Sequence, residues 1–163
     1  MAEWTHFDET GNPRMVDVGS KQPTRRRAVA EGWIDLPEKI WGALKSGGVK
    51  KGDPIPVSEI GGIMGAKRTP DLIPLCHAIM LDSVRVRCEV DDESRALRIE
   101  CEAIATGVTG VEMEALTGVS VAALVFYDMC KGVDKGMVLR NIRLLEKSGG
   151  KSGTWKAIDN GRE

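Results

Sequence analysis

Residues 83–106 read SVRVRCEVDDESRALRIECEAIAT, and this stretch decides the fold. Apolar and charged residues alternate over 83–90 and again over 96–106, which is the pattern of a β-strand with one buried and one exposed face. The polar residues 91–94 between the two segments are typical of a turn. The stretch therefore predicts an antiparallel hairpin that keeps one face toward water.

Further helix and strand patterns surround this hairpin. After it, residues 115–131 predict a long amphipathic helix that ends at Gly132, and residues 138–145 predict a final strand. Helices and strands that alternate around an antiparallel hairpin predict an α+β fold, a ferredoxin-like antiparallel sheet with helices packed on one face. Before the hairpin, the patterns predict strands over 15–18 and 25–36 and helices over 37–46, 57–67 and 69–75.

The length predicts one domain. The chain has 163 residues, so we expect 1–163 to form a single domain, with 1–13 as an N-terminal arm and the polar residues 147–163 as a flexible C-terminal tail.

The predicted helix 57–67 contains three glycines, each of which costs roughly 1 kcal/mol relative to alanine. We expect that another backbone, a partner or a ligand comes close to this helix.

Charge and aromatic content argue against a nucleic-acid partner. The 23 basic and 24 acidic residues leave a formal net charge of −1, so the chain is not a basic coat for nucleic acid. Aromatic residues make up 4% of the chain, too few for the exposed stacking platforms that bind single-stranded bases.

The cysteines and the apolar stretches predict a soluble, cytoplasmic protein. The four cysteines contain no C-x-x-C pair, so we expect no zinc site and, as a default, reduced thiols. Cys88 and Cys101 belong to the buried faces of the hairpin and are expected to pack as small hydrophobes. Residues 1–11 are polar and unlike a signal peptide, and the apolar stretch 119–127 is too short to span a membrane.

Two groups of residues before and at the start of the long helix could carry chemistry. His77 follows a short predicted helix and is either a satisfied surface residue or an acid/base group. Glu112 and Glu114 would converge if the backbone there is extended, and would supply favourable helix N-terminal charge if it is helical. The spacing does not decide between these alternatives.

A third group lies at the end of that helix. Asp128 and Lys131 are three residues apart and therefore neighbours on one helix face. Their apolar surroundings predict that at least one of them is partly buried, which would lower the pKa of the lysine and make it a usable base. Elsewhere, short basic clusters at 25–27, 50–51, 67–68 and 147–151 would suit a polyphosphate ligand.

Six motifs, in order along the chain, identify a family. These are MVDV from Met15, KGD from Lys51, AKRTPDLIPLCH (66–77), GVTGVEMEALT (107–117), YDMCK (127–131) and LLEKSGGKSG (144–153). With them the chain resembles the cyclic pyranopterin monophosphate synthase family, the molybdenum cofactor biosynthesis protein C family. The resemblance runs from about residue 5 to residue 156, and no motif residue is replaced.

The resemblance implies an activity and an assembly. It implies a lyase that converts 3′,8-cyclo-7,8-dihydro-GTP, made by an upstream radical SAM enzyme, into cyclic pyranopterin monophosphate with release of pyrophosphate. It also implies a homo-hexamer, a trimer of dimers with the site at a subunit interface. No cofactor or protein-bound metal is expected. Whether Mg²⁺ accompanies the triphosphate, and whether the upstream enzyme touches this chain, are left open.

The resemblance also assigns residues. It places Asp128, Lys51 and Lys131 as catalytic residues. Our own hypothesis is that the two lysines move protons and that Asp128 orients Lys131. The residues expected to bind substrate are Leu75, Cys76, His77, Met113, Glu114, Arg26, Lys67 and Lys147, to which the carboxylate pattern adds Glu112.

Two other classes of function fit parts of the pattern. A nucleotide-binding regulatory module would use the same basic clusters without turnover. A metal-dependent hydrolase could be built on His77 with Glu112 and Glu114, and chelators would inactivate it.

Overall fold

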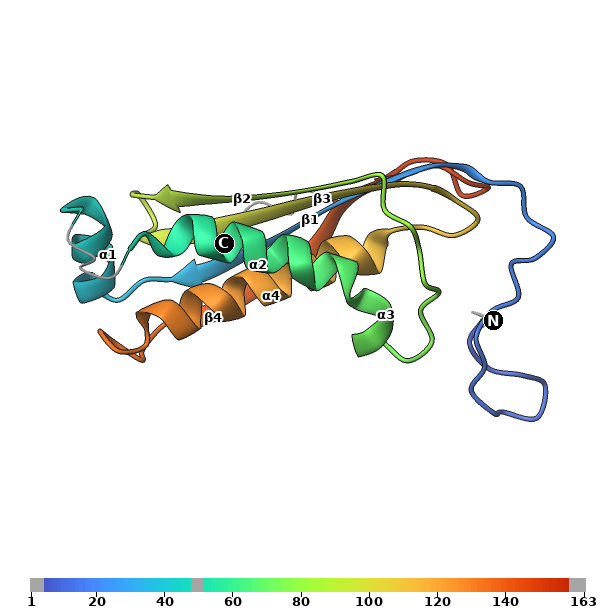
Figure 1. The fold of residues 1–163 in the computed structure, drawn as a ribbon, viewed down its shortest axis with the longest axis horizontal. Coiled ribbons are helices and arrows are strands. Elements are labelled where there is room, and N and C mark those ends of the chain that lie inside the picture. Colours follow the sequence, from blue (N-terminus) through green and yellow to red (C-terminus); the bar gives the residue numbers. More distant parts are fainter. Residues whose placement is uncertain (1–4, 48–51, 159–163) are drawn as a thin grey trace.

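The computed structural model describes residues 5–47 and 52–158, which form one antiparallel sheet with helices on one side (Figure 1). The strands follow the order β2-β3-β1-β4-β5 across the sheet. In chain order, the elements are β1 (Thr24–Asp35), α1 (Glu38–Lys45), α2 (Pro54–Lys67), α3 (Thr69–Leu72), β2 (Ser83–Asp91), β3 (Ala96–Gly107), α4 (Glu112–Cys130), β4 (Val138–Ser148) and β5 (Trp155–Lys156). The predicted α+β, ferredoxin-like sheet with helices on one face is confirmed.

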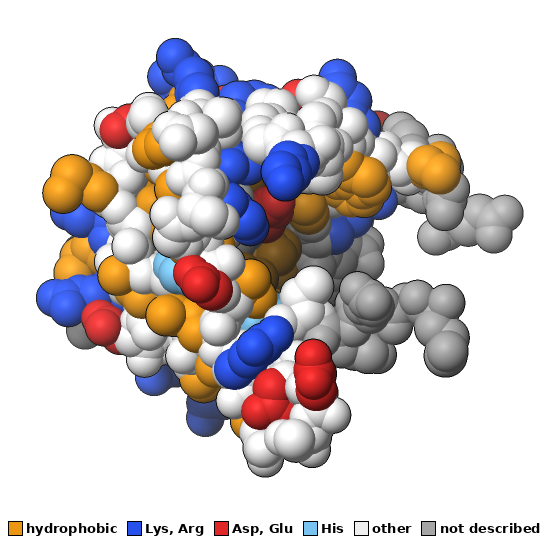
Figure 2. Space-filling model, turned by 90° about the vertical axis from the view of Figure 1, so that its right-hand side faces the viewer, with side chains coloured by type: hydrophobic (Ala, Val, Ile, Leu, Met, Phe, Trp, Pro, Cys, Tyr) orange, Lys and Arg blue, Asp and Glu red, His pale blue; other side chains and the backbone are white. Residues whose placement is uncertain are grey.

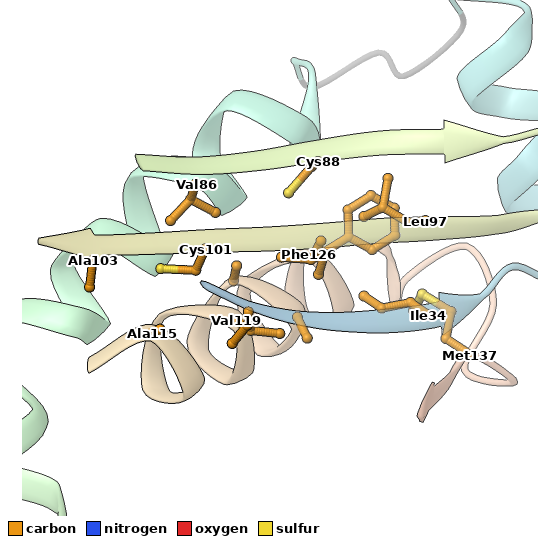
Figure 3. Packing of buried hydrophobic residues seen from close by; sticks show 14 of the residues in the cluster. Ile34, Val86, Cys88, Leu97, Cys101, Ala103, Ala115, Val119, Phe126 and Met137 are labelled. Carbon is orange, nitrogen blue, oxygen red and sulfur yellow. The ribbon is translucent and has the colours of Figure 1, made fainter. Parts of the chain in front are cut away.

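The hairpin that decided the fold has the predicted register. β2 and β3 pair antiparallel from Asp91↔Ala96 at the turn to Ser83↔Ile104 at the open end. Alternation places Val86, Cys88 and Cys101 on the buried face of the sheet (Figure 3). β3 also pairs along its whole length with β1, so the hairpin forms one side of the sheet, with β2 at the edge and β1 in the middle.

The core lies between the sheet and the two long helices, α2 and α4. Its largest fully buried side chains include Phe126 and Val119 from α4 and Ile34, Leu97 and Ile99 from the strands (Figure 3). α4 has the length and apolar composition of a membrane-spanning helix, but half of that stretch is buried inside the protein. We interpret α4 as the central core helix of the domain.

Small residues bring α2 and α4 together. A Cβ atom added to Gly62 would lie 2.8 Å from the carbonyl oxygen of Gly118, and one added to Gly65 would lie 2.6 Å from Val121. The expectation that glycines of this helix admit another backbone is confirmed, and that backbone is α4. Gly61 faces Val125, so the two helices run antiparallel, with the start of α2 beside the end of α4.

The other face of the sheet is covered by ion pairs. Glu31, at the middle of β1, is buried and pairs with Arg98 at 3.1 Å and Arg143 at 2.9 Å. Arg27 pairs with Glu102 at 2.6 Å. The long arginine side chains cover the sheet and the buried Glu31 while their guanidinium groups stay partly exposed, so this face stays polar without a second helix layer among the described residues.

The ends of the chain differ from the prediction. Residues 15–18 do not form a strand, because no strand within residues 5–47 and 52–158 pairs with them. The tail predicted to be flexible over 147–163 is partly ordered: β4 continues to Ser148, and Trp155 pairs back onto Lys147 as β5. Alternation in the polar residues of this segment is too weak a signal to predict a strand.

Glycine-to-alanine substitutions test the α2–α4 contact. We expect Gly62→Ala to lower the free energy of unfolding by about 1–2 kcal/mol, because the clash outweighs the gain in helix propensity. Gly42→Ala in α1 is the matched control: its Cβ would meet nothing within 4 Å, so alanine should stabilise by about 0.5–1 kcal/mol. Denaturant unfolding measures both variants, and an equal gain in stability from both would contradict the close contact.

Candidate active site

Three loop segments enclose a cavity of about 740 Å³ at one end of the sheet. They are residues 20–27, which include the start of β1, residues 108–112, which end on the first residue of α4, and residues 147–152, which include the end of β4 and the turn after it. We call this cavity the loop pocket. Figure 2 views this end of the molecule, where Lys and Arg side chains border a hollow. The volume is typical of cavities that bind small molecules.

The charged residues that line the loop pocket are mostly cations. Five basic side chains and a single carboxylate, that of Glu112, are among the described residues that line it. The guanidinium of Arg26 is held by the backbone, since Nε donates to the Gly107 carbonyl at 3.2 Å and Nη2 to the Val108 carbonyl at 3.3 Å. The other basic residues are Lys21, Arg27, Lys147 and Lys151. Such a site favours a polyanion.

The backbone at Glu112 and Glu114 is helical, which settles the alternative that the spacing left open. Glu112 is the first residue of α4, and the Glu114 side chain is buried, with 3% of the residue exposed. Burial, together with a smaller effect of the negative charge of Glu112, raises the pKa of Glu114 to about 6. Glu114 is therefore a carboxyl group that can exchange a proton near neutral pH.

Cys76 and His77 join this end of α4. Burial, and then the negative charge of Glu114, raise the pKa of the half-buried Cys76 thiol. The Nε2 atom of His77 lies 2.8 Å from the carbonyl oxygen of Val16, so it is the nitrogen that carries a proton. His77 thus has a hydrogen-bond partner and ties the N-terminal segment to the loop before β2.

The remaining predicted substrate-binding residues lie outside the lining of the loop pocket. Lys67 is exposed at the C-terminal end of α2, Leu75 is half-buried beside Cys76, and Met113 is exposed in the first turn of α4. Arg26, Glu112 and Lys147 are the predicted residues that line the pocket itself.

Asp128 and Lys131 lie at the opposite end of α4. Lys131 Nζ donates to Asp128 Oδ1 at 2.5 Å, and both side chains are well exposed, at 53% for Lys131 and 69% for Asp128. The expectation that one of them is partly buried is wrong for the single chain. The hydrogen bond and the charge of Asp128 raise the pKa of Lys131 instead of lowering it.

A single chain cannot bring the two ends of α4 to one substrate. Glu114 and Lys131 are 17 positions apart, so at 1.5 Å per residue they are separated by about 25 Å along the helix. Lys51 lies outside the described residues. Asp53, two positions later, caps the start of α2, which is beside the far end of α4.

Comparison with known proteins decides the family. The sequence model of the MoaC family matches residues 15–150, which include all of α4 and most of the residues that line the loop pocket. The chain belongs to the MoaC family.

Similar MoaC proteins carry one name. A relative from Novosphingobium aromaticivorans is 55% identical over 161 residues, covering 98% of this chain and all of the relative. One from Rhodospirillum rubrum is 54% identical over 94% of this chain and 92% of its own length. One from Lysinibacillus sphaericus is 50% identical over 95% of this chain and 98% of its own length. Each is named cyclic pyranopterin monophosphate synthase.

Sequence reasoning missed part of the loop pocket. Lys21 and Gln22 line it, but their segment carries only the signs of a polar loop. Lys151 was noticed as part of a basic cluster, yet no pattern indicated that its turn faces Arg26. One sequence signal could have indicated this part of the loop pocket. It is a polar loop that contains a lysine and lies next to a strand beginning with three arginines.

The pH dependence of stability tests the burial of Glu114. A carboxyl whose pKa rises from 4.5 in the unfolded chain to about 6 in the folded one destabilises the fold as the pH increases through that range. Glu114→Gln should remove this effect and be more stable than wild type above pH 6, by up to about 2 kcal/mol. The difference should shrink below pH 4.5, as measured by unfolding at several pH values. Parallel pH profiles for the two proteins would contradict the buried carboxyl.

Proposed function

We propose that this chain is a cyclic pyranopterin monophosphate synthase of molybdenum cofactor biosynthesis. It converts 3′,8-cyclo-7,8-dihydro-GTP into cyclic pyranopterin monophosphate and releases pyrophosphate. The observation that carries the proposal is the cationic loop pocket beside the buried Glu114, within a chain that belongs to the MoaC family.

The proposed substrate has two chemically different halves. Its triphosphate fits the loop pocket, where Arg26 and Lys147 neutralise the charge together with Lys21 and Lys151. Its purine-derived rings and sugar then lie toward the start of α4, within reach of the side chains there. These are Leu75, Cys76, His77, Glu112, Met113 and Glu114, and the exposed Lys67 lies at the same end of the helices.

The proposed reaction is a phosphorus–oxygen lyase reaction without a net redox change. The purine-derived base opens and rearranges by proton transfers. A sugar hydroxyl then attacks the α-phosphorus, a new phosphorus–oxygen bond forms, and the bond from the α-phosphorus to the bridging oxygen breaks. The hydroxyl proton passes to a base, and pyrophosphate leaves as an anion that the cations of the loop pocket stabilise.

Lys131 and Lys51 supply the proton transfers in this proposal, and Asp128 orients Lys131. In the single chain Lys131 is a protonated ammonium, because its hydrogen bond to Asp128 raises its pKa. Placing that ammonium beside the cations of a loop pocket would lower its pKa, since like charges disfavour the charged form. Contact between Lys131 of one protomer and the loop pocket of another would thus lower the pKa of Lys131 and make it a usable base.

This contact requires a second copy of the chain. A general acid or base acts within about 3 Å of the proton it transfers, whereas α4 holds Lys131 about 25 Å from Glu114. We therefore propose that the site combines the loop pocket of one protomer with the Asp128–Lys131 pair of another. A homo-hexamer built as a trimer of dimers, with the site at a subunit interface, satisfies this requirement.

The wider context follows from the substrate. The substrate is supplied by a radical SAM enzyme that acts on GTP, and we place both reactions in the cytoplasm. The proposal needs no cofactor bound by the protein, and neither a nucleic acid nor a membrane takes part. A Mg²⁺ ion bound with the triphosphate remains compatible with it.

Two other functions have less support. A regulatory nucleotide-binding module would need the loop pocket but gives no role to the Asp128–Lys131 pair. A metal-dependent hydrolase would need a cluster of donor side chains. Within residues 5–47 and 52–158, no group of three or more His, Cys, Asp or Glu residues is placed to hold an ion.

Turnover of the proposed substrate is the first test. We expect purified protein to convert 3′,8-cyclo-7,8-dihydro-GTP into the pterin product and pyrophosphate, both with and without EDTA. Lys131→Ala should lower kcat at least about a hundredfold, the size typical of a lost acid/base group. Lys39→Ala, an exposed lysine of α1, is the control and should keep the wild-type rate. Binding without turnover would favour the regulatory module, and loss of turnover with EDTA would bring a metal into the mechanism.

Mixing two inactive variants tests the shared site. Arg26→Ala removes a pocket residue and Lys131→Ala removes a residue at the far end of α4. When the two proteins exchange subunits at equal concentration, about a quarter of the interface sites should receive both intact residues. We expect activity to recover to that fraction of the wild-type rate. Mixed oligomers that form but stay inactive would show that each site is built from one chain.

A further inference from the structure

The turn after β4 lies directly against Arg26. Gly149 and Gly150 have φ values of +100° and +70°, in the left-handed region that favours glycine. Ser148, just before them, pairs with Arg27 of β1, so the turn passes over the neighbouring residue of that strand. A Cβ atom added to Gly150 would overlap Nη1 of Arg26 and lie 2.7 Å from its Cζ.

The guanidinium of Arg26 is thus enclosed from two directions. The carbonyls of Gly107 and Val108 accept hydrogen bonds from Nε and Nη2, and the backbone of Gly150 lies beside Nη1. These two bonds use two of the five N–H groups of a guanidinium. The Arg26 guanidinium, which carries the remaining N–H donors, lines the loop pocket, and its two backbone hydrogen bonds fix its plane.

We propose that Gly150 is a positioning residue for the triphosphate site. Having no side chain, it lets the Arg26 guanidinium lie flat against the turn, where the Gly107 and Val108 carbonyls hold it ready to bind the triphosphate. This inference rests on the proposed function for the nature of the ligand. A side chain at position 150 displaces the guanidinium from its carbonyl partners and weakens binding of the triphosphate without disrupting the fold.

The neighbouring glycines have different constraints. A Cβ atom on Gly149 would collide with the carbonyl oxygen of Arg25, which is backbone and cannot swing aside, so Gly149 protects the pairing of β1 with β4. A Cβ atom on Gly153, where φ is +60°, would meet nothing within 4 Å. Gly150 is the position where the collision falls on the end of a flexible side chain. Its substitution should therefore move Arg26 and leave the strands in place.

The comparison of Gly150→Ala with Gly153→Ala isolates this contact. Both substitutions place alanine at a positive φ in the same turn, so their backbone strain is similar. Inorganic tripolyphosphate, with binding measured by calorimetry, reports on the pocket without turnover. We expect Gly150→Ala to bind it about ten- to hundredfold more weakly, the loss expected for a charge-assisted hydrogen bond, and Gly153→Ala to bind like wild type. Equal affinities for the two variants would overturn the proposal.

A double-mutant cycle shows whether Gly150 acts through Arg26. If it does, adding Gly150→Ala to Arg26→Ala should weaken tripolyphosphate binding no further. With the natural substrate, Gly150→Ala should lower kcat/KM, and adding it to Arg26→Ala should lower kcat/KM no further, because both substitutions remove the same guanidinium contact. A further loss of binding in the double variant would overturn the proposed route through Arg26.

A crystal structure of ligand-free Gly150→Ala supplies a readout independent of function. We expect the Arg26 guanidinium to have left the Gly107 and Val108 carbonyls while β1 and β4 remain paired. A guanidinium still bonded to both carbonyls would overturn the proposal. A wild-type protein that binds tripolyphosphate but fails to turn over the cyclised nucleotide would overturn the function proposed above, and these comparisons would still decide the role of Gly150.

Discussion

The contact between α2 and α4 is the constraint on which the rest of the structure depends. Because Gly62 and Gly118 leave no side chain between the two helices, α4 packs closely against α2 and covers the sheet with Phe126 and Val119. This packing fixes α4 along its whole length. Its first turn is held beside the loop pocket, and its last turn is held at the other end of the molecule (Figure 1).

Because α4 is rigid, the proposed chemistry depends on how copies of the chain assemble. The cationic loop pocket and the buried Glu114 lie at one end, and the exposed Asp128–Lys131 pair lies at the other. In the single chain Asp128 raises the pKa of Lys131, which disfavours a role as a base, while the exposure of the pair leaves it accessible to a second copy. Like-charge contact with the loop pocket would lower the pKa of Lys131 only in the assembled protein, which would confine the chemistry to the complete site.

The sequence predicts most of the fold because its strongest signals are local. Alternation over 83–106 determines both strands of the β2–β3 hairpin, and the glycines within 57–67 correctly indicate a close helix neighbour. Residues 15–18 have the apolar pattern of a strand but lack a partner strand, and pairing is not a local property. The polar segment 147–152 was predicted to be flexible, yet it is ordered. Its first residues pair with distant residues of β1, and the local sequence does not reveal that pairing.

The candidate site is less predictable for the same reason. Helix spacing correctly made Asp128 and Lys131 neighbours. Of the apolar residues near them in sequence, however, Phe126 and Cys130 face the core, while the pair itself points outward. Exposure is a property of the packed helix, so it cannot be taken from adjacent residues. The burial of Glu114 and the clustering of Arg26 with the 147–152 turn also depend on tertiary packing.

The central claim is that one protomer's Lys131 meets another protomer's loop pocket. The most direct measurement places a photo-crosslinking amino acid at Met129, an exposed position between Asp128 and Lys131. After irradiation of the native assembly, the joined peptides are identified by mass spectrometry. The account predicts covalent dimers in which position 129 is joined to peptides containing residues 20–27 or 147–152. Exclusively intrachain products, or dimers joined only through other surfaces, would contradict it.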